Sequence, residues 1–250
     1  MQQSNTYVII FSAILTIVLG GLLSVTSVVL KPRQDKQVEL DTKKKILGAV
    51  MDVSAIEEPD AILALYKERI SSMVVDYQGN QLLVDAKGDS LVAEEINIQK
   101  NYKVDPKERM YPVFMFKNEQ GEVDGYVFPT FGAGLWDWIS SFVALEKDLN
   151  TIKGIAFDHK QETPGLGARI TDAVVQDRFK GTKIFEDGQL VSVRMLKGEG
   201  NSGLGDHQVD GLSGATMTAN GVNDMLSHYF ECYMPFIDKI KASGKVALAN

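Results

Sequence analysis

The segment DGLSGATMTANGV, residues 210–222, consists mainly of small and hydroxylated side chains, because nine of its thirteen residues are Gly, Ala, Ser, Thr or Asn. It holds no Cys or His that could bind a metal, and no nucleophile with a base beside it. The apolar residues Val222, Met225, Leu226 and Tyr229 then recur at the spacing of an amphipathic helix. The segment therefore predicts a sterically open loop that leads into a helix.

The start of this helix is a candidate phosphate site. Ser213 is placed to be its N-cap residue, and Gly214 and Ala215 leave the first turn open. Thr216 and Thr218 bring hydroxyl groups to that turn. A phosphate there would meet unpaired N–H donors and the positive end of the helix dipole. A capped helix without any ligand would have the same composition.

A second glycine-bearing segment is QETPGLGAR, residues 161–169. Pro164 and Gly165 are the residues that a type II turn prefers at its second and third positions, and Gly167 stands just before an expected helix. Such a loop exposes backbone N–H groups, which suit an anion or the polar edge of a flat ring system. The alternative is an ordinary turn between a strand and a helix.

A third such segment is PTFGAGLWDW, residues 129–138. Gly132 and Gly134 allow another backbone to approach closely, and Trp136 and Trp138 offer large flat faces. Packing of both tryptophans in the core is the simpler interpretation.

The N-terminus contains an uncharged run of 24 residues, Tyr7 to Leu30. At about 1.5 Å per residue a helix of this length crosses the ~30 Å hydrocarbon layer of a membrane. We expect an uncleaved transmembrane helix at residues 7–30, preceded by a short tail at residues 1–6. A cleaved signal peptide is the rival interpretation, but its apolar core would be shorter and the residues before it basic.

The rest of the chain predicts an α+β domain, residues 46–250, after a polar stalk at residues 31–45. Helices are expected at residues 58–73, 135–148 and 167–181. Short runs bounded by Gly, Asn, Asp or Pro predict five strands: QLLVDAKG (81–88), YPVFMFKN (111–118), DGYVFPTF (124–131), IKGIAFDH (152–159) and GQLVSVRML (188–196).

Composition excludes several classes of function. The formal net charge of −7 argues against a nucleic-acid partner, since neutralising phosphates requires a basic face. The single cysteine, Cys232, cannot form an internal disulfide, and the three histidines lack metal-ligand spacing. The sequence offers no candidate catalytic residue and no candidate metal site.

The motif DGLSGAT resembles the D-x-x-[S/T]-G-A-T flavinylation motif of the FMN-binding domain family. In that family a flavin transferase moves FMN from FAD onto the threonine of the motif, which leaves a phosphoester bond. The segments ETPGLG and GLWDW and the single N-terminal anchor match the same family. The likeness is to the C subunits of Na+-translocating NADH:quinone reductases and covers nearly the whole chain; the flavin subunit of Rnf complexes is a close relative.

The resemblance implies a set of site residues in an FMN-binding region at about residues 120–235. The acceptor of the covalent FMN is Thr216, with Thr218 as the competing hydroxyl. The other positions expected to bind FMN are Glu162, Thr163, Leu166, Gly167, Trp136, Ser213, Gly214 and Ala215. Asp210 is assigned to recognition by the transferase, and capping of a local turn is its alternative role. Because a threonine hydroxyl is a poor nucleophile, the activating base and metal should belong to the transferase.

The function implied by the resemblance is that of a membrane-anchored electron carrier in a complex that oxidises NADH, reduces ubiquinone and pumps Na+. The flavin supplies the redox chemistry and the protein positions it. The chain has no GxGxxG motif after a strand and no charge in its span, so the NADH and Na+ sites should lie on partner subunits. Further expected partners are the flavin transferase and membrane lipid. The alternatives are an Rnf-type or free-standing covalent FMN carrier, or a non-redox anchored binding domain.

Two arguments about topology conflict. Lys31, Arg33 and Lys36 directly follow the span, which favours a cytoplasmic location of the soluble domain. The family likeness instead implies the outer, periplasmic side of the inner membrane. We expect the outer side, because complex assembly can override a weak charge signal.

Overall fold

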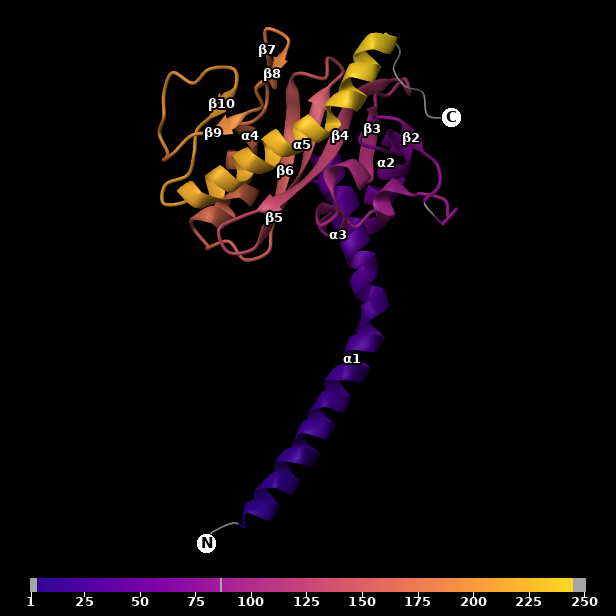
Figure 1. Ribbon diagram of the computed structural model, residues 1–250, viewed down its shortest axis with the longest axis vertical. Coiled ribbons are helices and arrows are strands. Elements are labelled where there is room, and N and C mark those ends of the chain that lie inside the picture. The colour runs from indigo at the N-terminus through magenta and orange to yellow at the C-terminus, as the bar shows by residue number, and fades with distance from the viewer. Residues whose placement is uncertain (1–3, 86, 245–250) are drawn as a thin grey trace. The chain divides into compact units, whose positions relative to one another are not determined.

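The computed structural model describes residues 4–85 and 87–244 (Figure 1). Its contacts divide the chain into two compact units, Met1–Lys43 and Lys44–Asn250. Residues 1–3 of the expected N-terminal tail and residues 245–250 of the expected soluble domain lie outside the described residues.

The first unit consists of most of the helix α1, Asn5–Gly48. Its most apolar 18-residue window has a mean hydropathy of 2.6 and is not buried anywhere inside the structure. Among the described residues, α1 is the one helix long and apolar enough to cross a membrane. The helix continues through Pro32 and through the expected polar stalk, where Lys43 pairs with Glu39 one turn earlier.

The second unit is built on a six-stranded antiparallel sheet with the strand order β2-β1-β3-β4-β5-β6. Its strands are β1 Ile70–Val75, β2 Gln81–Leu82, β3 Tyr111–Lys117, β4 Val123–Ala133, β5 Trp138–Glu146 and β6 Ile152–His159. The four strands from β3 to β6 are consecutive in the chain, and each pairs with the next. A mixed α and β domain after one N-terminal apolar helix confirms the predicted α+β class.

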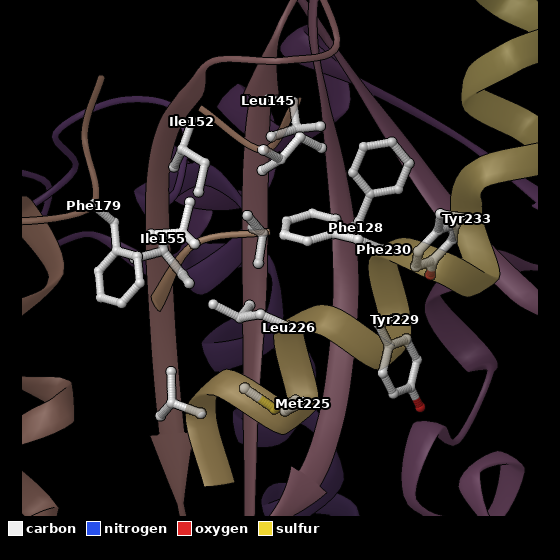
Figure 2. Close-up of a cluster of buried hydrophobic side chains, with 14 of the residues drawn as sticks. Phe128, Leu145, Ile152, Ile155, Phe179, Met225, Leu226, Tyr229, Phe230 and Tyr233 are labelled. Atoms are coloured by element: carbon white, nitrogen blue, oxygen red, sulfur yellow. The ribbon is translucent and has the colours of Figure 1, made fainter. Parts of the chain in front are cut away.

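The long C-terminal helix α5, Thr216–Ser243, crosses one face of this sheet (Figure 1). Its apolar stripe points at the strands, and Figure 2 shows Leu226 and Tyr233 directed toward Phe128 on β4 and the neighbouring strands. The rings of Phe128 and Tyr233 lie 4.7 Å apart, and the Tyr233 hydroxyl donates to the carbonyl oxygen of Pro112 at 2.9 Å. This buried contact fixes α5, and therefore its N-terminal end, against the sheet.

The other elements of the second unit are short. They are α2 Pro59–Arg69, the 3-10 helix η1 Ala93–Glu95, α3 Ile98–Tyr102, η2 Pro106–Glu108, η3 Gly167–Thr171, α4 Ala173–Asp177, β7 Phe185–Glu186, β8 Gln189–Leu190, β9 Arg194–Met195 and β10 Gln208–Val209. β7 and β8 form a hairpin, and β9 pairs in parallel with β10 just before the DGLSGAT motif.

The helix predicted at residues 135–148 is wrong, because this segment forms β5 in the middle of the sheet. Its apolar residues Trp138, Ile139, Phe142 and Val143 fit helical spacing, but Ile139, Ser141 and Val143 are the buried ones and alternate with half-buried neighbours. That alternation is the period of a strand. Pairing with both β4 and β6 overrides the local pattern.

Three other predicted elements are shorter than expected. The helix predicted at residues 167–181 is split into η3 and α4, because Asp172 has an extended backbone. The strand predicted at residues 81–88 is reduced to β2, and the one predicted at residues 188–196 is divided between β8 and β9. In these stretches the chain turns before a longer ladder can form.

Candidate functional site

Three segments meet in a pocket of about 190 Å³ at one end of the sheet. They are the loop between β4 and β5, the turn after β6, and the first turn of α5 with the residues before it. The lining residues are Leu135, Glu162, Thr163, Leu166, Gly167, Gly214, Ala215, Thr216, Met217 and Thr218. The three glycine-bearing segments identified in the sequence thus converge on one site.

The turn after β6 has the form that its sequence predicts. The backbone N–H of Leu166 donates to the carbonyl oxygen of Thr163 at 3.1 Å, and Gly165 between them has a φ of +75°. Together with Pro164 at the second position, this is the pattern of a type II turn. Leu166 directs 40% of its surface to solvent at the pocket, which is a large apolar exposure for this residue type.

The buried carboxylate of Glu162 connects all three segments. One of its oxygens, Oε1, accepts hydrogen bonds from the backbone N–H groups of Leu135 at 2.7 Å and Trp136 at 3.3 Å. The other, Oε2, accepts a hydrogen bond of 2.5 Å from the hydroxyl of Thr218. Every one of these bonds is donated to the carboxylate, which suits its acceptor-only ionised form.

The helix α5 begins at Thr216, and the prediction that Ser213 is its N-cap residue is wrong. Ala215 occupies the N-cap position, and no side chain caps the helix. Ser213 lies outside the helix and is exposed. The chain reaches Ala215 through Gly214, whose φ of +73° excludes most other residues. An uncapped first turn leaves backbone N–H donors for an incoming anion.

The two threonines of this turn have different environments. Thr216 is half-buried and lines the pocket. Thr218 is 1% exposed, and its hydroxyl is held by Glu162. Of the two hydroxyl groups, the one on Thr216 is therefore the accessible one.

Trp136 lies at the edge of the pocket and is 68% exposed, so the expectation that it packs in the core is wrong. Its indole N–H donates to the Thr163 hydroxyl at 3.1 Å, which ties the loop before β5 to the turn after β6. It lines an adjoining hollow together with Tyr102, Phe131 and Trp138. Trp138 does pack on the core, with its ring 5.7 Å from that of Phe131.

Asp210 lies outside the pocket and organises the loop before it. Burial opposes ionisation of this carboxyl, but hydrogen bonds from the backbone N–H groups of Gly200 and Asn201 and from the Asn201 amide outweigh it and lower the pKa to about 2. Arg178 donates to the carbonyl oxygens of Asp210 and Gly211 and pairs with Glu199. Asp210 therefore does cap a local turn in this structure.

The predicted site residues separate into those inside and outside the pocket. Those that line it are Glu162, Thr163, Leu166, Gly167, Gly214, Ala215 and Thr216. Trp136 reaches it only through Thr163, and Ser213 and Asp210 do not line it. The sequence analysis missed the lining residues Leu135 and Met217, and it considered Thr218 only as a rival acceptor. The close sequence neighbours GLWDW and GATMT were the available signal for both missed residues.

Comparison with known proteins gives a consistent result. The family model described as FMN-binding domain matches residues 134–231, a range that contains the whole pocket. The C subunit of the Na(+)-translocating NADH-quinone reductase of Neisseria meningitidis serogroup B is 30% identical, and the match covers 96% of this chain and 95% of that protein. Its counterpart in Haemophilus ducreyi is also 30% identical, over 96% of this chain and 94% of the relative.

Solved structures show the same similarity. The crystal structure of the corresponding protein of this reductase from Parabacteroides distasonis superposes with a TM-score of 0.69 at 31% identity, and covers 83% of this chain and 96% of that one. The crystal structure of Shewanella oneidensis NqrC has a TM-score of 0.69 at 26% identity, over 82% and 98% of the two chains.

Proposed function

The chain belongs to the family of C subunits of the Na(+)-translocating NADH-quinone reductase, and on this premise we propose that it carries one FMN as a phosphoester on the side-chain oxygen of Thr216. As a member of this family it is an FMN-carrying electron-transfer subunit of a multi-subunit membrane oxidoreductase. Its apolar helix α1 is consistent with a single-pass protein of the inner membrane.

The observation that carries the proposal is the half-buried hydroxyl of Thr216 at an uncapped helix start. An ester phosphate on this oxygen would lie beside the free N–H donors of the first turn of α5, which favour negative charge. Gly214 and Ala215 add little bulk in front of the hydroxyl, so a transferase can reach it.

The pocket residues fit the remainder of the group. Leu135, Leu166 and Met217 present apolar surface, and the turn around Gly165 presents backbone polar groups. A flat ring system with one apolar face and a polar edge requires this combination. When bound, FMN supplies the ability to accept and pass on electrons, and the protein residues position it and set its polarity.

Two further parts of the proposal concern maturation and topology. A flavin transferase installs the group, since no base lies within the described hydrogen bonds of Thr216. The soluble domain lies on the outer side of the inner membrane. The family likeness supports this side, although the basic flank Lys31, Arg33 and Lys36 favours the other.

Flavin fluorescence in a denaturing gel tests the proposal. The wild-type chain, produced together with a flavin transferase, should retain the fluorescence after denaturation, and Thr216→Val should lose it. Valine keeps the size and branching of threonine but removes the oxygen. Covalent flavin that persists in Thr216→Val would exclude this acceptor.

A further inference from the structure

Glu162 has no oxygen left without a protein donor. It is 4% exposed, and its carboxylate receives two backbone N–H groups from the loop before β5 and the hydroxyl of Thr218 from α5. Each of these contacts joins Glu162 to a different part of the pocket wall. Buried carboxylates with several donors hold their surroundings strongly, because removing them leaves the donors unpaired.

The two glycines nearest to this carboxylate show how closely the site is built around it. A Cβ atom on Gly134 would approach Oε1 to 2.3 Å, and one on Gly167 would approach both Oε2 and the Thr218 hydroxyl to 2.4 Å. Neither distance is possible for a real side chain. The backbone on both sides therefore packs directly on the carboxylate.

We infer that Glu162 is a positioning residue for the attachment of the flavin, not a residue whose main contact is the flavin itself. Its carboxylate holds the loop at Leu135, the turn at Thr163 and the first turn of α5 in one arrangement. It also commits the hydroxyl of Thr218 as a donor, so that Thr216 is the threonine presented to the transferase. The inference rests on the proposed function, in which Thr216 is the acceptor.

The chain contains a matched control for this carboxylate. Glu94 also accepts hydrogen bonds on both oxygens, from the Tyr66 hydroxyl at 2.8 Å and the Ser72 hydroxyl at 3.1 Å. It joins α2, β1 and η1, and it does not line the pocket. Truncation of Glu94 therefore removes a similar set of bonds without touching the acceptor site.

The test measures the rate of flavin attachment on the full-length chain. Wild type, Glu162→Ala, Glu162→Gln, Gly167→Ala and Glu94→Ala are purified in detergent from cells without a transferase. Each is then incubated with a flavin transferase and FAD, and bound FMN is followed by intact-protein mass. Circular dichroism checks that each variant is folded.

We expect Glu162→Ala and Gly167→Ala to be modified at least about tenfold more slowly than wild type, because a displaced acceptor loses its alignment. Glu162→Gln should recover most of the rate. Its amide oxygen can accept from the Leu135 and Trp136 N–H groups, and its amide nitrogen can donate to the Thr218 oxygen. Glu94→Ala should be modified at the wild-type rate.

Several results would overturn the inference. They are a wild-type rate in folded Glu162→Ala, an equal loss in Glu94→Ala, or a Glu162→Gln variant as slow as Glu162→Ala. If Glu162→Ala fails to fold, Gly167→Ala and Glu162→Gln carry the same test. Failure of the proposed function has a separate signature, which is absence of covalent FMN from the wild-type chain.

Discussion

The guanidinium of Arg109 lies 3.0 Å from the ring nitrogen Nε2 of His228, on the face of α5 remote from its first turn. Arg109 is buried, and its other donors go to the carbonyl oxygens of Val104 and Tyr102. Because a guanidinium can only donate, Nε2 must accept, which requires a neutral imidazole. Burial, together with the Arg109 cation, lowers the pKa of His228, against a smaller opposite effect of Glu231.

This pair predicts a stability that depends on pH. The pKa of His228 is lower in the folded protein than the ~6.5 of an unfolded chain, so below that pH the unfolded state binds the extra proton. The stabilisation is present above about pH 6.5 and is lost as the pH falls. Urea unfolding of the detergent-solubilised chain, followed by tryptophan fluorescence, should show this loss.

His228→Gln is the corresponding variant, since its amide oxygen can still accept from Arg109 but does not titrate. The decrease in unfolding free energy between about pH 8 and pH 5.5 should be smaller in this variant than in wild type. An identical decrease in both proteins would assign the pH dependence to other groups.

Thr218→Val should destabilise the domain without preventing flavin attachment. The substitution leaves Oε2 of Glu162 buried without a donor, which costs about 1–3 kcal/mol. Thr218→Ser keeps the hydroxyl and should be nearer to wild type. Urea unfolding measures the stability and gel fluorescence the attachment; loss of covalent flavin in a folded Thr218→Val would show that Thr218 takes part in modification.

Gly165→Val should change the flavin environment through the backbone alone. A Cβ atom at this position would meet no other atom within 4 Å, but the φ of +75° is strained for a β-branched residue. The expected cost of keeping the turn is about 1–3 kcal/mol, so the turn should distort and shift the absorption band and midpoint potential of the bound flavin.

Gly121 is the control for this substitution, because it also has open space and a φ of +79° but lies in the connection between β3 and β4. Gly121→Val should leave the flavin spectrum unchanged. A folded Gly165→Val with the wild-type spectrum and potential would return the turn at residues 163–166 to a purely structural role.

Protease accessibility tests the proposed topology. Protease added to intact spheroplasts should digest the domain that follows α1, because we place it on the outer side of the inner membrane. Full protection in spheroplasts, with digestion only after lysis, would show instead that Lys31, Arg33 and Lys36 determine the orientation.

The sequence predicts local features of the site better than its long-range contacts. The turn at Pro164 and Gly165 depends on the backbone preferences of these two residues, so it can be recognised from them alone. The bond between Glu162 and Thr218 joins residues 56 positions apart and depends on how α5 lies against the sheet. No local pattern encodes it.

The incorrect assignment of β5 has a similar cause. Trp138, Ile139, Phe142 and Val143 fit a helix as well as a strand, and only pairing with β4 and β6 decides between them. The incorrect N-cap at Ser213 arose because serine is a good capping residue, whereas the helix begins after Ala215 without a side-chain cap. At a site that is proposed to bind a phosphate, the missing cap is itself informative.

Peptide mass spectrometry of the purified chain tests the central claim most directly. After production with a flavin transferase, the fragment that contains residues 210–222 should carry the mass of one FMN, and fragmentation should place it on Thr216. Without the transferase the same fragment should be unmodified, even when FMN is plentiful, since the hydroxyl lacks an activating base. FMN on Thr218, or an unmodified fragment when the transferase is present and active, would contradict the account.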